Sequence, residues 1–153
     1  MQRTWKAAVL VVAGVWTAAC GENAFVTGVL STGANLAGRW NYNAQNVAGS
    51  GRSCNVIGVV VTIDQKGSTF TGNVTGGSVS CTEGGEVVLE YPLLDDVIAN
   101  GRINGSTVSF DIGGPEVHHT GSVSGNSLTG QLTIQADSSV NAPRLIGPYT
   151  MTR

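Results

Sequence analysis

Few side chains in this sequence are of the types that carry out chemistry, and they fall into three groups. Three cysteines form the first group. The second is Glu116, His118 and His119 in "PEVHHTG", residue types that bind metal ions or transfer protons. The third is the pair Asp95 and Asp96, since two carboxylates can hydrolyse a glycoside when they flank its bond. Each group must be judged by the element that would position it.

The histidine and aspartate groups fit poorly with a reactive site. Successive side chains on a strand point to opposite faces, so Glu116 and His118 would share one face and His119 the other. Two adjacent imidazoles then cannot hold one metal ion without a bend, and a solvent-facing histidine beside a glutamate is the simpler interpretation. The aspartates follow Pro92, which disfavours a central strand, and no second acid is placed opposite them. We interpret "PLLDD" as a loop at the mouth of the domain.

The sequence contains none of the common catalytic or phosphate-binding motifs, such as G-x-S-x-G or H-E-x-x-H. We therefore expect no catalytic residues, no metal site and no cofactor, and an enzyme is the class with least support. The formal net charge is −2 and no run of basic residues occurs, so a nucleic-acid partner is not expected.

The first cysteine follows a segment with the features of an export signal. Arg3 and Lys6 precede the apolar run "AAVLVVAGVWTAA", which is shorter than the roughly 20 residues that span a membrane. The run ends in "TAAC" and resembles the lipobox of bacterial lipoproteins. That resemblance implies a signal peptide over residues 1–19 and lipidation of Cys20. Cleavage after "TAA" without lipidation, or a plain apolar helix, are the alternatives.

A lipid on Cys20 implies a membrane-bound protein of the cell envelope. Because glycine rather than aspartate follows the cysteine, the resemblance favours the periplasmic side of the outer membrane. Residues 20–35 would form a flexible tether to a domain over residues 36–153, with an extra strand at "AFVTGVL" as the alternative.

Cys54 and Cys81 then remain as a pair, and export favours a disulfide between them. If "VIGVVVTIDQ" and "STFTGNV" form a hairpin that turns at "QKGS", the numbers of opposed residues add to roughly 132 to 135. The numbers of the two cysteines add to 135. A metal site is the competing interpretation, but the chain has no C-x-x-C pair and no histidine near either cysteine.

Composition and periodicity predict an all-β fold. The 153 residues include 22 glycines, and only 12% are charged. Apolar and polar residues alternate with the period of a strand that has one buried face, as in Ile57, Val59, Val61 and Ile63. Turn sequences such as "EGGE" and "SGN" separate these runs. Strands are predicted at about 38–43, 56–64, 68–74, 78–81, 86–91, 97–103, 106–112, 117–124, 127–135 and 146–152.

These short strands predict a single antiparallel up-and-down meander that closes into a small barrel of about eight strands. Closure would leave no free strand edge. The first strand carries Gly38 and Trp40 in "LAGRWNY", which resembles the G-x-W that opens lipocalins and the start of avidin-like barrels. The lipocalin resemblance implies that an arginine at the end of the last strand packs over the tryptophan, and Arg153 occupies that position. Biotin is not an expected ligand, because Trp40 is the only tryptophan after the signal segment.

The barrel interior is the candidate binding site, and the sequence leaves two possibilities open. The inward side chains line a calyx for an apolar or amphipathic small molecule, or they fill a narrow barrel and leave a structural or protein-interaction module of the envelope. Gly72, Gly121 and Gly130 would face inward, where they either open space or admit bulky neighbours. The candidate lining residues are Trp40, Val59, Val61, Phe70, Phe110, Leu132, Tyr149 and Met151.

Overall fold

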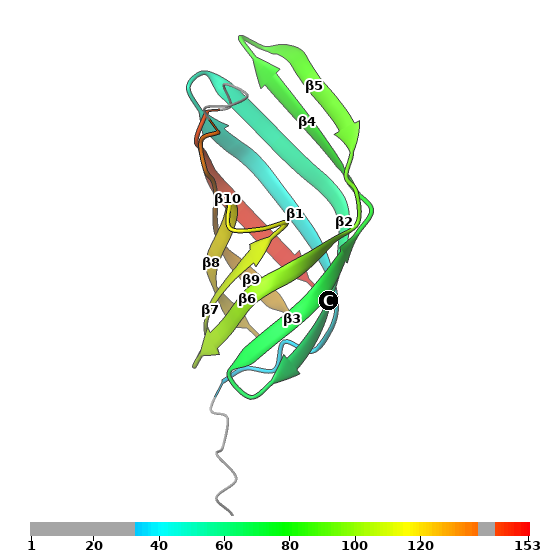
Figure 1. The fold of residues 1–153 in the computed structure, drawn as a ribbon, viewed down its shortest axis with the longest axis vertical. Coiled ribbons are helices and arrows are strands. Elements are labelled where there is room, and N and C mark those ends of the chain that lie inside the picture. The colour runs from blue at the N-terminus through cyan, green and yellow to red at the C-terminus, as the bar shows by residue number, and fades with distance from the viewer. Residues whose placement is uncertain (1–32, 138–142) are drawn as a thin grey trace, which may run out of the picture.

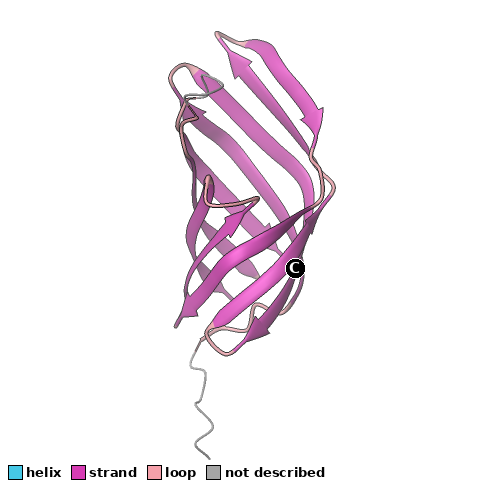
Figure 2. Cartoon of the chain, viewed as in Figure 1, coloured by secondary structure: helices cyan, strands magenta, loops and turns pink. Residues whose placement is uncertain are grey.

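The computed structural model describes residues 33–137 and 143–153, and this part of the chain is an antiparallel β-structure (Figures 1 and 2). No helix long and apolar enough to cross a membrane occurs among the described residues. Each of the ten predicted ranges corresponds to an observed strand. The strands are β1 (Gly38–Gly49), β2 (Arg52–Lys66), β3 (Thr69–Thr75), β4 (Ser78–Glu83), β5 (Glu86–Pro92), β6 (Asp96–Asn104), β7 (Thr107–Ile112), β8 (Val117–Ser124), β9 (Ser127–Ile134) and β10 (Leu145–Thr152).

Eight of these strands close into a barrel. The sheet runs in the order β1-β10-β9-β8-β7-β6-β3-β2-β4-β5, and β1 also pairs with β2, which joins the two sides of the ring. Every pairing is antiparallel. In β3 and β10 the one-sided burial follows the alternation in the sequence residue by residue. The predicted fold class, an all-β meander that closes into an eight-strand barrel, is confirmed.

The hairpin of β4 and β5 lies outside the ring and extends one end of the barrel (Figure 1). It exists because β2 is 15 residues long: its second half pairs with β3, and its first half pairs with β4. Residue numbers in every opposed β2–β3 and β2–β4 pair add to 135, which lies within the range predicted for the hairpin. Cys54 therefore faces Cys81, and the predicted disulfide between them is confirmed. We call this extension, Ser78 to Pro92, the flap.

One prediction of the alternation is wrong in β2. Ile57 was expected to face inward with Val59, yet its exposed fraction is 52%. Gly58 has a φ of 72°, and the register with β1 shifts there, which marks a β-bulge. The extra residue reverses the alternation, so Val56 rather than Ile57 faces the interior.

The flap leaves one strand edge that the predicted closed barrel would not have. Among the described residues, β5 pairs only with β4, and Val87 and Val88 on it are exposed. The edge is protected against pairing with another chain by the charges of Glu86 and Glu90, by Pro92, and by a register shift in its pairing with β4.

The end of the barrel opposite the flap is filled. Leu36, just before β1, is fully buried, and its carbonyl oxygen accepts a hydrogen bond of 2.7 Å from Trp40 Nε1. The buried side chains at this end come from all eight ring strands and form part of one hydrophobic cluster. They include Leu36, Trp40, Val61, Ile63, Phe70, Ile103, Val108, Val123, Leu128 and Met151.

Two of the inward glycines let a large ring cross the barrel. Gly121 on β8 and Gly130 on β9 are directly opposed. A Cβ atom at Gly130 would lie 2.8 Å from Cε1 of Tyr149, and one at Gly121 would lie 2.7 Å from the Tyr149 hydroxyl. Tyr149 is buried against this glycine pair. At this level, the glycines admit a bulky neighbour and open no space.

Candidate ligand-binding site

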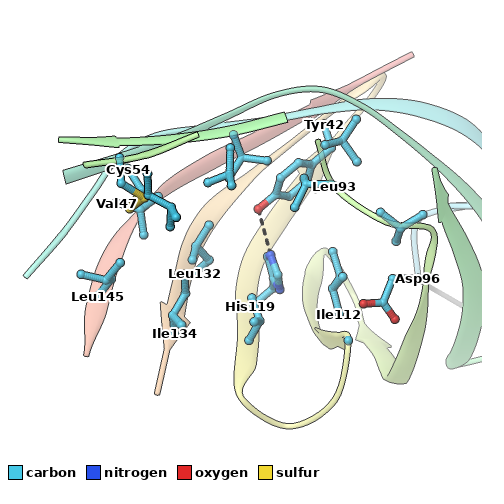
Figure 3. A pocket seen from close by; sticks show the side chains of 18 of the residues that line it. Tyr42, Val47, Cys54, Leu93, Asp96, Ile112, His119, Leu132, Ile134 and Leu145 are labelled. Atoms are coloured by element: carbon cyan, nitrogen blue, oxygen red, sulfur yellow. Dashed lines mark hydrogen bonds between the residues drawn. A yellow bond between two sulfur atoms is a disulfide. The ribbon is translucent and has the colours of Figure 1, made fainter. Parts of the chain in front are cut away.

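The flap end of the barrel is hollow and contains a cavity of about 370 Å³ (Figure 3). That volume is within the range of small-molecule sites in proteins. Valine, leucine and isoleucine side chains make up most of the lining. The lining residues are Tyr42, Val47, Arg52, Cys54, Val56, Val59, Val74, Val79, Cys81, Leu89, Tyr91, Leu93, Asp96, Ile112, Gly113, Val117, His119, Leu132, Ile134, Pro143 and Leu145.

The two ends of the barrel differ because of the side chains that point inward. Phenylalanine, tryptophan and tyrosine rings cross the interior in the filled half, whereas the inward positions of the flap half carry smaller residues such as Val47, Val56 and Val79. The flap extends one wall beyond the ring, and the disulfide fixes that wall to β2. The inward side chains thus leave a cavity in one half of the barrel and fill the other half.

The candidate lining residues from the sequence divide between these halves. All eight are buried inside the barrel. Val59 and Leu132 line the cavity. The other six pack in the filled half or between the two halves, and they are Trp40, Val61, Phe70, Phe110, Tyr149 and Met151.

The inner end of the cavity carries a polar pair that was not among the candidate lining residues. The Tyr42 hydroxyl on β1 lies 3.0 Å from His119 Nε2 on β8, within hydrogen-bonding distance (Figure 3). The imidazole stacks on Phe110 with 4.5 Å between ring centroids and meets Tyr149 edge-on at 4.9 Å. Tyr42 and His119 both line the cavity, and we call them the floor pair.

Burial fixes the protonation states of these groups. The exposed fraction of His119 is 0%, and burial lowers its pKa to about 4, so the imidazole is neutral at pH 7. Burial likewise raises the pKa of the Tyr42 hydroxyl far above its ordinary value, with a smaller contribution from Tyr149. The floor pair is therefore polar but uncharged.

Two buried polar atoms, one in the floor pair and one beside it, have no hydrogen-bond partner among the described residues. They are His119 Nδ1 and the Tyr149 hydroxyl oxygen. Tyr149 does not line the cavity, whereas His119 does. An unpaired polar atom in a protein interior costs about 1 to 3 kcal/mol, so a group that pairs with Nδ1 would be favoured at the floor.

The mouth of the cavity combines two charged groups with an apolar rim. Arg52 lines the mouth, and its Nε donates to Glu83 Oε1 at 2.6 Å. Asp96 also lines the cavity and accepts a hydrogen bond of 2.8 Å from the backbone N–H of Val97. Of the predicted loop "PLLDD", only Leu93, Leu94 and Asp95 lie between strands, because Pro92 ends β5 and Asp96 begins β6. Leu93 lines the cavity, and Leu94 has an exposed fraction of 86%. Exposed apolar side chains at a rim suit the passage of an apolar ligand.

His118 occupies a separate place on the outside of the barrel. Its Nδ1 lies 2.6 Å from Asp111 Oδ1, and Asn100 Nδ2 donates to Asp111 Oδ2 at 2.8 Å. Burial raises the pKa of Asp111, but the hydrogen bonds from Asn100 and His118 together outweigh it and leave the pKa below its usual range. His118 is thus a partly exposed histidine on the outer face, as expected, and its hydrogen-bond partner is Asp111, directly opposite on β7. No group of three or more potential metal ligands is present in residues 33–137 and 143–153.

The end opposite the cavity shows the contact that the lipocalin resemblance implied. The guanidinium carbon of Arg153 lies 4.5 Å from the centroid of the Trp40 ring. The same guanidinium donates to the carbonyl oxygens of Ala37 and Asn35, each at 3.0 Å. Arg153 therefore fastens the segment before β1 across the filled end. Cys20 and the alternative strand at 24–30 lie outside the described residues.

No family model, curated protein or solved structure shows a significant match to this chain.

Proposed function

We propose that the protein is a non-enzymatic, lipid-anchored protein of the cell envelope whose lipocalin-like barrel binds an apolar or amphipathic small molecule in the cavity beside the flap. The observation that carries this proposal is the cavity itself: about 370 Å³, lined mainly by aliphatic side chains, with a polar pair at its floor. Trp40 under Arg153 supports the lipocalin-like assignment.

The proposed anchor is consistent with the way the chain reaches the barrel. Ala34 donates a backbone hydrogen bond to Gly105, and Leu36 donates one to the Gln65 side chain, so residues 34–36 are held at the filled end. The flap, whose residues Val79, Leu89 and Tyr91 line the cavity, lies at the other end of the barrel (Figure 1). A lipid on Cys20 would therefore join the domain on the side away from the mouth and leave the cavity open to the periplasm.

Ligand binding can be tested with a variant that fills the cavity. Ile134 on β9 lines the cavity, and Ile146 on β10 is an exposed isoleucine on the neighbouring strand. We expect the uncharged dye N-phenylnaphthylamine to bind saturably to the mature chain with Cys20→Ser, which cannot be lipidated. Ile134→Trp should weaken this binding at least about tenfold, which corresponds to 1.4 kcal/mol, whereas Ile146→Trp should leave it unchanged.

The same titration distinguishes the alternative function. If no dye or extracted envelope lipid binds saturably, the ligand-binding proposal is wrong and a structural or protein-interaction module becomes the better account. If Ile134→Trp and Ile146→Trp weaken binding equally, the dye does not occupy this cavity. Circular dichroism of both variants shows that each remains folded.

The anchor is tested separately by membrane fractionation. With Cys20→Ser, the protein should appear in the soluble periplasmic fraction or accumulate as an uncleaved precursor. Unchanged processing together with unchanged membrane association would contradict lipidation. Sucrose-gradient separation of the inner and outer membranes then tests the outer-membrane assignment.

A further inference from the structure

The floor pair restricts where protons can lie. If the Tyr42 hydroxyl donates to His119 Nε2, the ring proton is on Nδ1, and a single N–H lacks an acceptor. If Nε2 carries the proton and donates to Tyr42, both the tyrosine hydrogen and the Nδ1 lone pair lack partners. The first arrangement leaves fewer unsatisfied groups and is favoured.

Backbone groups near His119 also favour a proton on the imidazole. The carbonyl oxygens of Val117 and Phe110 lie near the imidazole and favour a proton on the ring. By distance and angle, Nδ1 has no hydrogen-bond partner among the described residues. The floor of the cavity therefore offers one N–H donor that requires an acceptor.

The charges around the cavity limit what that acceptor can be. The Asp96 carboxylate lines the same cavity and repels an anion, and Arg52 is already engaged by Glu83 at 2.6 Å. Since the His119 imidazole is neutral at pH 7, it offers an anion no opposite charge. A cation is also disfavoured at the floor, because the hydrogen of the N–H group is the positive end of its dipole and repels a positive charge. An uncharged acceptor oxygen fits these constraints.

We propose that the cavity selects an uncharged, mainly apolar molecule with one carbonyl or hydroxyl oxygen, and that His119 Nδ1 donates a hydrogen bond to this oxygen. This inference rests on the proposed ligand-binding function. The aliphatic walls contact the apolar part of the ligand. The hydrogen bond at the floor orients the ligand with its oxygen toward His119.

The oxygen can reach Nδ1 only after a small movement, because the exposed fraction of His119 is 0%. In Figure 3 the second ring nitrogen lies on the side of the imidazole toward Ile112, which also lines the cavity. Ile112 is only partly buried, so a rotamer change there is the movement we expect.

The test uses three probes of nearly the same shape: acetylnaphthalene, isopropylnaphthalene and naphthoate, each substituted at the same ring position. They compete with N-phenylnaphthylamine for the mature Cys20→Ser chain. Acetylnaphthalene should bind about fivefold more tightly than isopropylnaphthalene, the effect of one net hydrogen bond, and naphthoate should bind weakest. The infrared carbonyl band of bound acetylnaphthalene should lie at lower frequency than in an alkane.

Two variants assign the preference to a residue. His119→Phe keeps a ring that can stack on Phe110 and should abolish the fivefold preference while isopropylnaphthalene still binds. Tyr149→Phe is the matched control, because it removes the other unpaired buried polar atom from a side chain outside the cavity lining. It should leave the preference unchanged. If His119→Phe does not fold, the infrared shift in the unsubstituted protein decides the matter.

The outcomes separate this inference from the proposed function. If none of the probes binds, the ligand-binding function fails and the inference fails with it. If the ketone and the hydrocarbon bind equally well, as they would with water retained on Nδ1, the cavity binds ligands but the inference is wrong. Tightest binding of naphthoate, or a preference that survives His119→Phe, would also overturn it.

Discussion

Mild acid should destabilise this protein through His119. The imidazole is fully buried and its pKa is about 4 in the folded chain, against 6.5 for an unperturbed histidine. Between these values the unfolded chain binds a proton that the folded chain does not, so the free energy of unfolding falls as the pH falls. At pH 5 this loss is about 2 kcal/mol relative to pH 7.5.

Other groups near His119 should contribute little over this pH range. Tyr42 and Tyr149 titrate only in strong alkali, because burial raises the pKa of both hydroxyls. Asp111 has a lowered pKa, so its contribution to stability is present above about pH 4 and is lost only at lower pH. We therefore attribute the expected fall in the free energy of unfolding between pH 7.5 and pH 5 to His119.

The assay is urea unfolding at pH 7.5 and pH 5, followed by circular dichroism, for the unsubstituted chain and two variants. His119→Gln removes the buried titrating group and should reduce the loss at pH 5 by about 2 kcal/mol. His118→Gln changes the outer histidine, whose side chain is 46% exposed, and should retain the loss. A loss that is the same in all three proteins would refute the assignment to His119.

Three further substitutions test the fold. Replacing both Cys54 and Cys81 by serine should lower the free energy of unfolding by about 3 to 4 kcal/mol in the chain-entropy model, and an unchanged urea midpoint would contradict that role. Gly130→Ala should destabilise by about 1 to 3 kcal/mol, because its Cβ would collide with the Thr120 carbonyl oxygen and the Tyr149 ring; Thr129→Ala on the same strand is the control. Arg153→Met should cost about 0.5 to 1.5 kcal/mol through the lost hydrogen bonds to the carbonyl oxygens of Ala37 and Asn35, measured by the same unfolding assay, and equal stability would show that these hydrogen bonds contribute nothing.

The strands could be predicted because every ring strand has one buried face, and a period of two is visible in sequence. The disulfide could be predicted because antiparallel register makes the sum of opposed residue numbers constant. The bulge at Gly58 could not, since glycine inside an alternating run is equally consistent with a regular strand. The resulting reversal moved Ile57 to the surface.

The cavity was harder to predict than the strands, because it depends on how inward side chains from strands distant in sequence share one space. A signal for the floor pair was nevertheless present: Trp40, Tyr42 and Ala44 alternate on β1, and His119 alternates with Val117 and Val123 on β8. Both patterns predict an inward polar ring. The contact between the Tyr42 hydroxyl and His119 Nε2 at 3.0 Å depends on barrel closure, which no local sequence pattern predicts.

Barrel closure has a consequence for the order of assembly. Strand β1 pairs with β2, its neighbour in sequence, and also with β10, the last strand of the chain. Until β10 has been synthesised and has paired with its neighbours, the backbone groups along one side of β1 and one side of β9 have no partner in the barrel. Joining segments so far apart carries a large loop-closure cost and makes folding slow. The incomplete chain therefore passes through a stage with two open, aggregation-prone strand edges. This stage ends only when β10, which is eight residues long, pairs with β1 and β9.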